Sequence, residues 1–220
     1  MTESDFLVEA SPPVEDFPWP PREGASILDS LATTWKESVF HPIRFFRRMP
    51  IEFDFGWVLG YYLILGIVTG GISLFWEMVL GPSVAERWLP EGAFAAAQNP
   101  IVDFLLSPLF LVMALFIAAG VVHLFLLVMR GAKNEYGTTL RVFCYSVGPQ
   151  LFVIVPFVGG VAGGLWSLII TVIGLREAHQ TSNTKALLAV LLPLAFLAFF
   201  AILLVAMGTL MGLGLGQAAG

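Results

Sequence analysis

The chain has 220 residues, of which 57% are hydrophobic and 12% charged, and its formal net charge is −5. Soluble domains average about 45–50% apolar and about 25% charged residues, so a soluble fold of this length would expose more apolar surface than its few polar groups can cover. The composition therefore predicts a membrane protein of one domain, and the acidic balance excludes nucleic acid as an expected partner.

The acidity is concentrated at the N-terminus, where residues 1–54 hold ten of the 16 Asp and Glu residues. Residues 1–24 combine acids with five prolines and predict a disordered arm. Residues 25–49 predict an amphipathic helix at the membrane interface, because apolar side chains recur there at helical spacing: Leu28, Leu31, Trp35 and Val39. Pro42 interrupts this helix, and the aromatic and arginine residues that follow either meet anionic head groups or flank the first span and set topology.

Five long apolar runs predict an all-α membrane protein with five transmembrane helices within residues 50–213, followed by a glycine-rich tail at 214–220. The third run is broken at Pro149–Gln150, and a tight turn at Gly159–Gly160 leads from it into the fourth. The five runs cover, in order, about residues 55–80, 101–129, 139–158, from the Gly159–Gly160 turn to 175, and 186–211.

The distribution of basic residues predicts the orientation of these spans. From the N-terminal segment through the loops to the tail, Lys and Arg number 5, 1, 3, 0, 2 and 0. This alternation is typical of a cytoplasmic N-terminus and an external C-terminus in a five-span protein.

Five polar side chains fall in or near the apolar runs: Glu77, Asp103, His123, Arg141 and Gln150. Because such residues are costly in lipid, they are candidates for a polar path, formed above all by His123 and Gln150. The alternatives are that Asp103 reaches the external interface, that Arg141 extends to the cytoplasmic one, and that Gln150 satisfies the backbone break at Pro149.

Small residues recur four positions apart and predict close helix packing. The candidates are Gly159 with Gly163, Gly160 with Gly164, and Gly208 with Gly212. Packing within the bundle and packing between subunits both remain open, and the pair in the fifth span is the candidate for a subunit interface.

Arg176, Glu177 and His179 close the fourth span and are either a solvated helix end or a cytoplasmic docking or gating surface. No catalytic constellation is found, so we expect neither an enzyme nor a cofactor. The three histidines, His41, His123 and His179, lie in different segments and predict no metal site. The single cysteine, Cys144, predicts a small core residue.

A family resemblance is carried by residues 139–192, and by the Trp35-to-Met49 segment that precedes the spans. The matching features are Tyr145 with Pro149, Pro156 with Gly159–Gly160, Trp166, and Gly174-Leu175 followed by His179 and Lys185-Ala186. Over about residues 30–205 the chain resembles the prokaryotic branch of the Yip (Ypt/Rab-interacting protein) domain family. The resemblance implies five spans, a cytoplasmic N-terminus and an external C-terminus. Eukaryotic members bind Rab GTPases, but the short acidic arm here matches no GTPase-binding region, so GTPase binding is not expected.

Two functions are compatible with these features. The first is a non-enzymatic scaffold or adaptor in a bacterial inner membrane, with the lipid bilayer, other membrane proteins or further copies of itself as partners. The alternative is a small-solute permease, channel or lipid-handling protein with a path through the broken third span.

Overall fold

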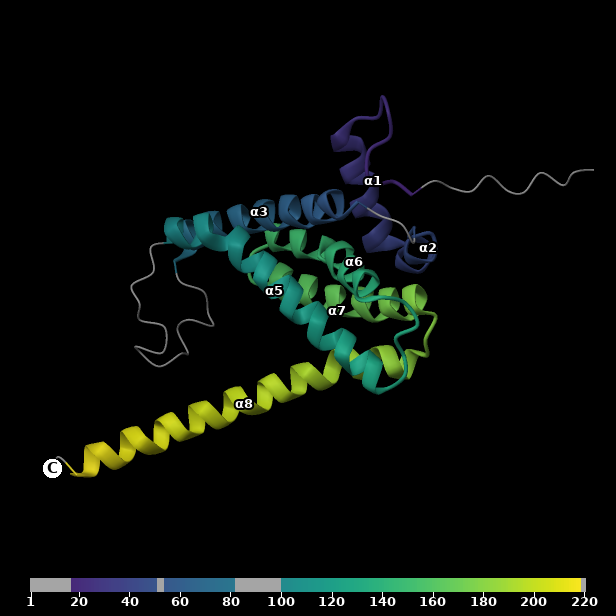
Figure 1. Ribbon diagram of the computed structural model, residues 1–220. Coiled ribbons are helices and arrows are strands. Elements are labelled where there is room, and N and C mark those ends of the chain that lie inside the picture. The colour runs from purple at the N-terminus through teal and green to yellow at the C-terminus, as the bar shows by residue number, and fades with distance from the viewer. Residues whose placement is uncertain (1–16, 51–53, 82–99, 219–220) are drawn as a thin grey trace, which may run out of the picture.

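The computed structural model describes residues 17–50, 54–81 and 100–218, and these residues form helices and no strand (Figure 1). The acidic residues 1–16 and the expected loop at 82–99 lie outside the described residues. The helices are α1 (Ile27–Phe40), α2 (Pro42–Arg47), α3 (Phe55–Leu80), α5 (Pro100–Val128), α6 (Tyr136–Ser146), the 3-10 helix η1 (Gly148–Ile154), α7 (Val158–His179) and α8 (Asn183–Ala218).

Four helices are long and apolar enough to cross a membrane: α3, α5, α7 and α8. At most 33% of the most apolar stretch of any of them is buried within the chain. A helix that is apolar on its outward surface needs an apolar solvent. The expected all-α membrane protein is thus confirmed.

The expected third span is an α-helix followed by a 3-10 helix. α6 ends at Ser146, and η1 begins at Gly148 with Pro149 in its first turn. This is the break that the Pro149–Gln150 step predicts, because proline cannot donate the hydrogen bond that would continue the α-helix. The two pieces together rise about 30 Å. α6 packs against both α5 and α7.

The turn into α7 differs from the expected one. It lies at Val155–Phe157, where Phe157 has φ 65° and ψ −53° and the backbone N–H of Val158 donates to the carbonyl of Pro156 at 2.8 Å. Gly159 and Gly163 instead lie inside α7, where a Cβ atom would overlap the carbonyl oxygens of Phe152 and Pro149. These two glycines therefore let α7 lie directly on the backbone of η1.

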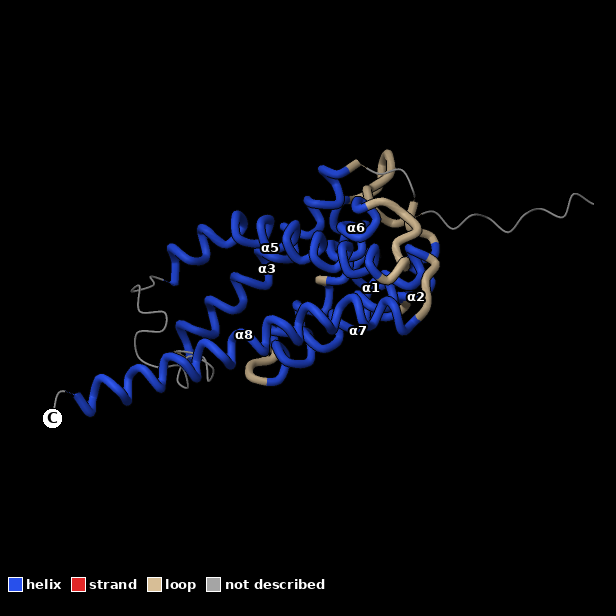
Figure 2. Tube along the Cα trace, turned by 60° about the horizontal axis from the view of Figure 1, so that its bottom comes forward, coloured by secondary structure: helices blue, strands red, loops and turns tan. Residues whose placement is uncertain are grey.

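The N-terminal segment, residues 17–49, packs across one end of the bundle, which we call the α2 end (Figure 2). Residues 17–24 are ordered here, contrary to the expected disordered arm. Trp19 is 1% exposed, and its indole Nε1 donates to the carbonyl of Trp57 at 2.7 Å. An acidic, proline-rich composition predicts disorder because such a segment has little apolar surface to bury. Here the Trp19 indole is buried, and this burial favours an ordered conformation.

α1 packs on the bundle through both apolar and small polar side chains. Of the expected apolar stripe, Val39 is fully buried, Leu31 and Trp35 are partly buried against the core, and Leu28 is 73% exposed. Ser30, Thr34 and Ser38 are buried beside them, because short side chains let the helix approach the bundle closely. The exposed apolar residues face outward, where an interface would accept them.

α8 begins beside α5 and α7 and then leaves the bundle (Figure 1). All side chains from Leu194 to Thr209 are exposed. The helix continues to Ala218, so most of the expected tail at 214–220 is helical.

Candidate functional site

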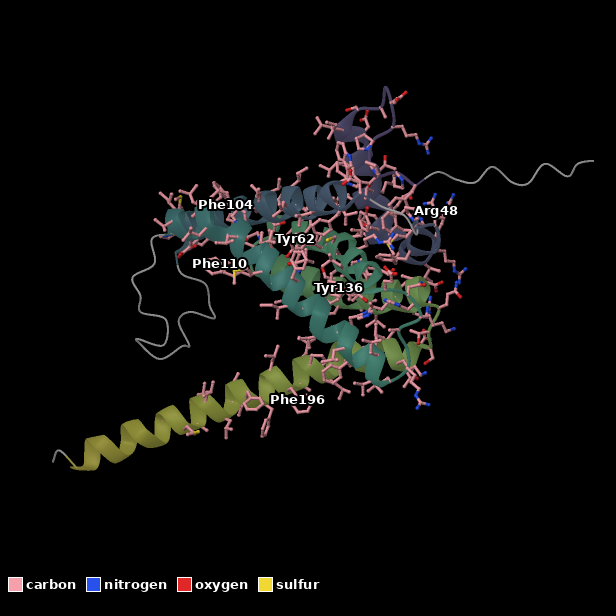
Figure 3. The ribbon with its side chains drawn as sticks, viewed as in Figure 1. Arg48, Tyr62, Phe104, Phe110, Tyr136 and Phe196 are labelled. Carbon is pink, nitrogen blue, oxygen red and sulfur yellow. The ribbon has the colours of Figure 1, made fainter. Side chains whose placement is uncertain are left out.

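A polar cavity of about 930 Å³ opens at the α2 end of the bundle. Its walls come from α2, the end of α5, the loop at 130–135, the start of α6 and the end of α7. Figure 3 shows the nitrogen atoms of basic side chains gathered at this end, near the labelled Arg48, whereas the sticks along α8 are mainly carbon. The charged lining residues are Arg47, Lys133, Glu135, Arg141 and Glu177.

A hydrogen-bonded chain joins two histidines at this cavity. Nδ1 of His123, on α5, lies 2.8 Å from the hydroxyl of Thr139, on α6. The same hydroxyl lies 2.8 Å from Nε2 of His179, the last residue of α7. The backbone N–H of Asn134 donates to Nδ1 of His179 at 3.3 Å. No pattern in the sequence indicates that these histidines meet, because they lie in different segments far apart in the chain.

Arg141 lies inside the protein, contrary to the expectation that it extends to the interface. It is 3% exposed. Its guanidinium donates to the carbonyl of Pro50, to the Thr138 hydroxyl at 3.2 Å and to the Gly137 carbonyl at 3.4 Å. These acceptors replace the water that a buried cation loses. Arg141 thereby joins the start of α6 to the segment just before α3.

The side chains of Arg176, Glu177 and His179 form hydrogen bonds within the fold. The Glu177 carboxylate accepts from Arg47 at 2.7 Å and from the neighbouring Arg176, and Arg176 also donates to Asn183 at 3.0 Å. His179 is fully buried. Arg176 and Glu177 thus connect α7 to α8 and to α2, and His179 connects it to α6 through Thr139.

Gln150 lines a second, more open cavity of about 550 Å³, to which Gly160 and Gly164 also contribute. Its side-chain nitrogen lies 3.5 Å from the Ser167 hydroxyl. His123 lines the first cavity and not this one. The two residues of the expected polar path are thus not brought together.

Asp103 and Gly208 line neither cavity. Asp103 is exposed in the first turn of α5. Gly160, Gly164 and Gly208 have open space where a Cβ atom would lie. The packing of Gly212 lies outside the described residues.

Within the described ranges no group of three His, Cys, Asp or Glu side chains could hold a metal ion. The histidine chain has only two metal-binding side chains, and His41 is not part of it. Cys144 is fully buried in the core, as its apolar surroundings predicted.

Comparison with known proteins identifies a family. The Yip1 domain family model matches residues 36–206, which include every helix from α2 to α7 and much of α8. No curated protein and no solved structure matches the chain. The match covers most of the sequence and includes the cavity at the α2 end, and the chain therefore belongs to the Yip1 domain family.

Proposed function

We propose that this protein is a non-enzymatic membrane scaffold that associates with further copies of itself through α8. The observation that carries the proposal is the uncovered length of that helix. Sixteen consecutive residues, 194–209, are exposed, which corresponds to about 24 Å of helix. Their side chains are almost all apolar, and they leave the bundle that would otherwise cover them (Figure 1).

Lipid alone can solvate such a helix, so self-association needs a further reason. Gly208 supplies one, because the space where its Cβ atom would lie is open in the single chain. In lipid, small residues let two helix backbones approach closely and gain van der Waals contact that lipid tails provide less well. The open position at Gly208 would admit the backbone of a second α8.

The experiment is disulfide crosslinking in native membranes. Cys144 is first replaced by alanine, which removes the single native thiol. Gly208→Cys is then compared with Val68→Cys, which lies on α3 and is 46% exposed. We expect mild oxidation to give a covalent dimer for Gly208→Cys and a monomer for Val68→Cys. Equal yields from the two positions, or no dimer from either together with a monomer mass by light scattering in mild detergent, would refute the proposal.

We further propose a bacterial inner-membrane location with the N-terminus in the cytoplasm and five crossings, the third made by α6 and η1. The alternation of basic loop residues and the combined length of those two helices support it. In the same Cys144→Ala background, Lys36→Cys should react with a membrane-impermeant maleimide only in inverted vesicles. Reaction in intact spheroplasts would show that the N-terminus is external and would refute the proposed orientation.

A further inference from the structure

We propose that the cavity at the α2 end binds the phosphate of an anionic phospholipid head group. This inference does not depend on self-association through α8. At about 930 Å³ the cavity lies within the range of about 300–1,000 Å³ that small-molecule sites occupy. It also lies where two apolar spans end, at Val128 and His179. Head groups occupy that depth, because they begin where the hydrocarbon core stops.

The charged groups of the cavity favour an anion. Three cations line it, Arg47, Lys133 and Arg141, and they come from α2, the 130–135 loop and α6. The lining also contains two carboxylates, those of Glu135 and Glu177. Glu177 is paired with Arg47 and with Arg176, which brings a further positive charge to its carboxylate. Positive charge therefore remains in excess around the cavity, and it converges from several elements rather than from one flexible side chain.

The histidine chain adds a neutral donor to this set. Because the Asn134 N–H donates to Nδ1 of His179, a neutral His179 carries its proton on Nε2 and donates it to Thr139. The Thr139 hydroxyl then donates to Nδ1 of His123, which leaves the His123 proton on Nε2. Nε2 of His123 makes no bond to Thr139, which uses Nδ1. His123 itself lines the cavity. The hydrogen-bonded chain thus leaves an N–H on a side chain that lines the cavity, and an N–H can donate to a phosphate oxygen.

The apolar part of the lining explains why a lipid, rather than a soluble phosphate, is the expected ligand. Phe46, Met49 and Leu127 line the same cavity. Leu127 is 53% exposed, and its neighbours Leu124 and Val128 are 58% and 75% exposed on the surface of α5. An acyl chain leaving the cavity would therefore continue along an apolar helix surface, where each buried methylene adds to binding.

The test is native mass spectrometry of the full chain in mild detergent, titrated with phosphatidylglycerol or with phosphatidylcholine of the same acyl chains. We expect one phosphatidylglycerol to bind about tenfold tighter than phosphatidylcholine. Lys133→Gln should weaken phosphatidylglycerol binding about fivefold, since it removes one cation at the membrane surface. Lys36→Gln removes an exposed lysine of α1 outside the cavity and should leave binding unchanged. His123→Phe should weaken phosphatidylglycerol binding, because it removes the N–H donor while keeping an aromatic ring at this position.

Three outcomes would overturn the proposal: equal affinity for the two lipids, equal weakening by Lys133→Gln and Lys36→Gln, or displacement of the lipid by soluble glycerol phosphate. Displacement by glycerol phosphate would indicate that the cavity binds a free phosphate ester. A lipid that is held by its acyl chains as well as its phosphate should not be displaced. Lys133 lies in an exposed loop, so its variant tests the proposal even where His123→Phe fails to fold.

Discussion

Two adjacent glycines of α7 provide a matched pair for testing the packing of α7 on η1. A Cβ atom at Gly159 would overlap the carbonyl oxygen of Phe152, whereas one at Gly160 would meet nothing within 4 Å. Alanine has the same intrinsic preference for helix over glycine at both positions, about 1 kcal/mol. The two substitutions therefore differ only in what the added methyl group touches.

The expected magnitudes follow from these contacts. Overpacking costs about 1–3 kcal/mol, and at Gly159 the obstacle is backbone, which cannot rotate aside as a side chain would. We therefore take the upper end of the overpacking cost, about 3 kcal/mol, and subtract the gain of about 1 kcal/mol from the helix preference of alanine. Gly159→Ala should then be about 2 kcal/mol less stable than the unmodified protein. Gly160→Ala should gain up to about 1 kcal/mol.

The assay is reversible unfolding in mixed detergent micelles, followed by circular dichroism. Gly163→Ala and Gly164→Ala repeat the comparison one turn later, since a Cβ atom at Gly163 would overlap the Pro149 carbonyl and one at Gly164 would touch nothing. If both members of a pair shift the midpoint equally, the close approach of α7 to η1 is wrong.

Three further predictions concern the contacts of the N-terminal segment and the core. Trp166→Phe removes the indole hydrogen bond to the Val39 carbonyl, 2.9 Å long, so it should lower the free energy of unfolding by about 1–2 kcal/mol and speed amide exchange in α1. Trp57 is 40% exposed and its ring contacts Trp19 edge-on, so Trp57→Phe should cost less and leave amide exchange in α1 unchanged. Arg47→Gln should cost under about 1 kcal/mol because that side chain is 66% exposed; a loss of several kcal/mol by thermal unfolding would contradict this. Cys144 is fully buried, so maleimide should label it only after denaturation.

Local patterns in the sequence predicted most of the elements. The apolar runs gave the bounds of α3 and α5 to within one residue, because lipid imposes a long, unbroken apolar stretch on each span. Proline chemistry located the break between α6 and η1. Four-residue spacing identified the glycines of α7, although only contacts across the bundle decide that Gly159 packs and Gly160 does not.

The site could not be predicted in the same way. His123 and His179 meet only because α5 and α7 both end beside Thr139, and no periodicity encodes that meeting. The packed face of α1 was predicted only in part. Hydrophobic spacing identified Val39, which is buried, but it also included Leu28, which is exposed, and it gave no sign that the polar Thr34 is buried.

The contacts of the N-terminal segment constrain the order in which the protein matures during synthesis. Trp35 donates to the carbonyl of Gly148, 113 residues later; Trp166 donates back to Val39 across 127 residues; and Arg47 pairs with Glu177 across 130. The N-terminal segment can meet α3 early through Trp19, but it can complete its docking only after α7 has been inserted. A nascent chain arrested before α7 should still expose residues 17–49 to protease, and one arrested after α8 should protect them.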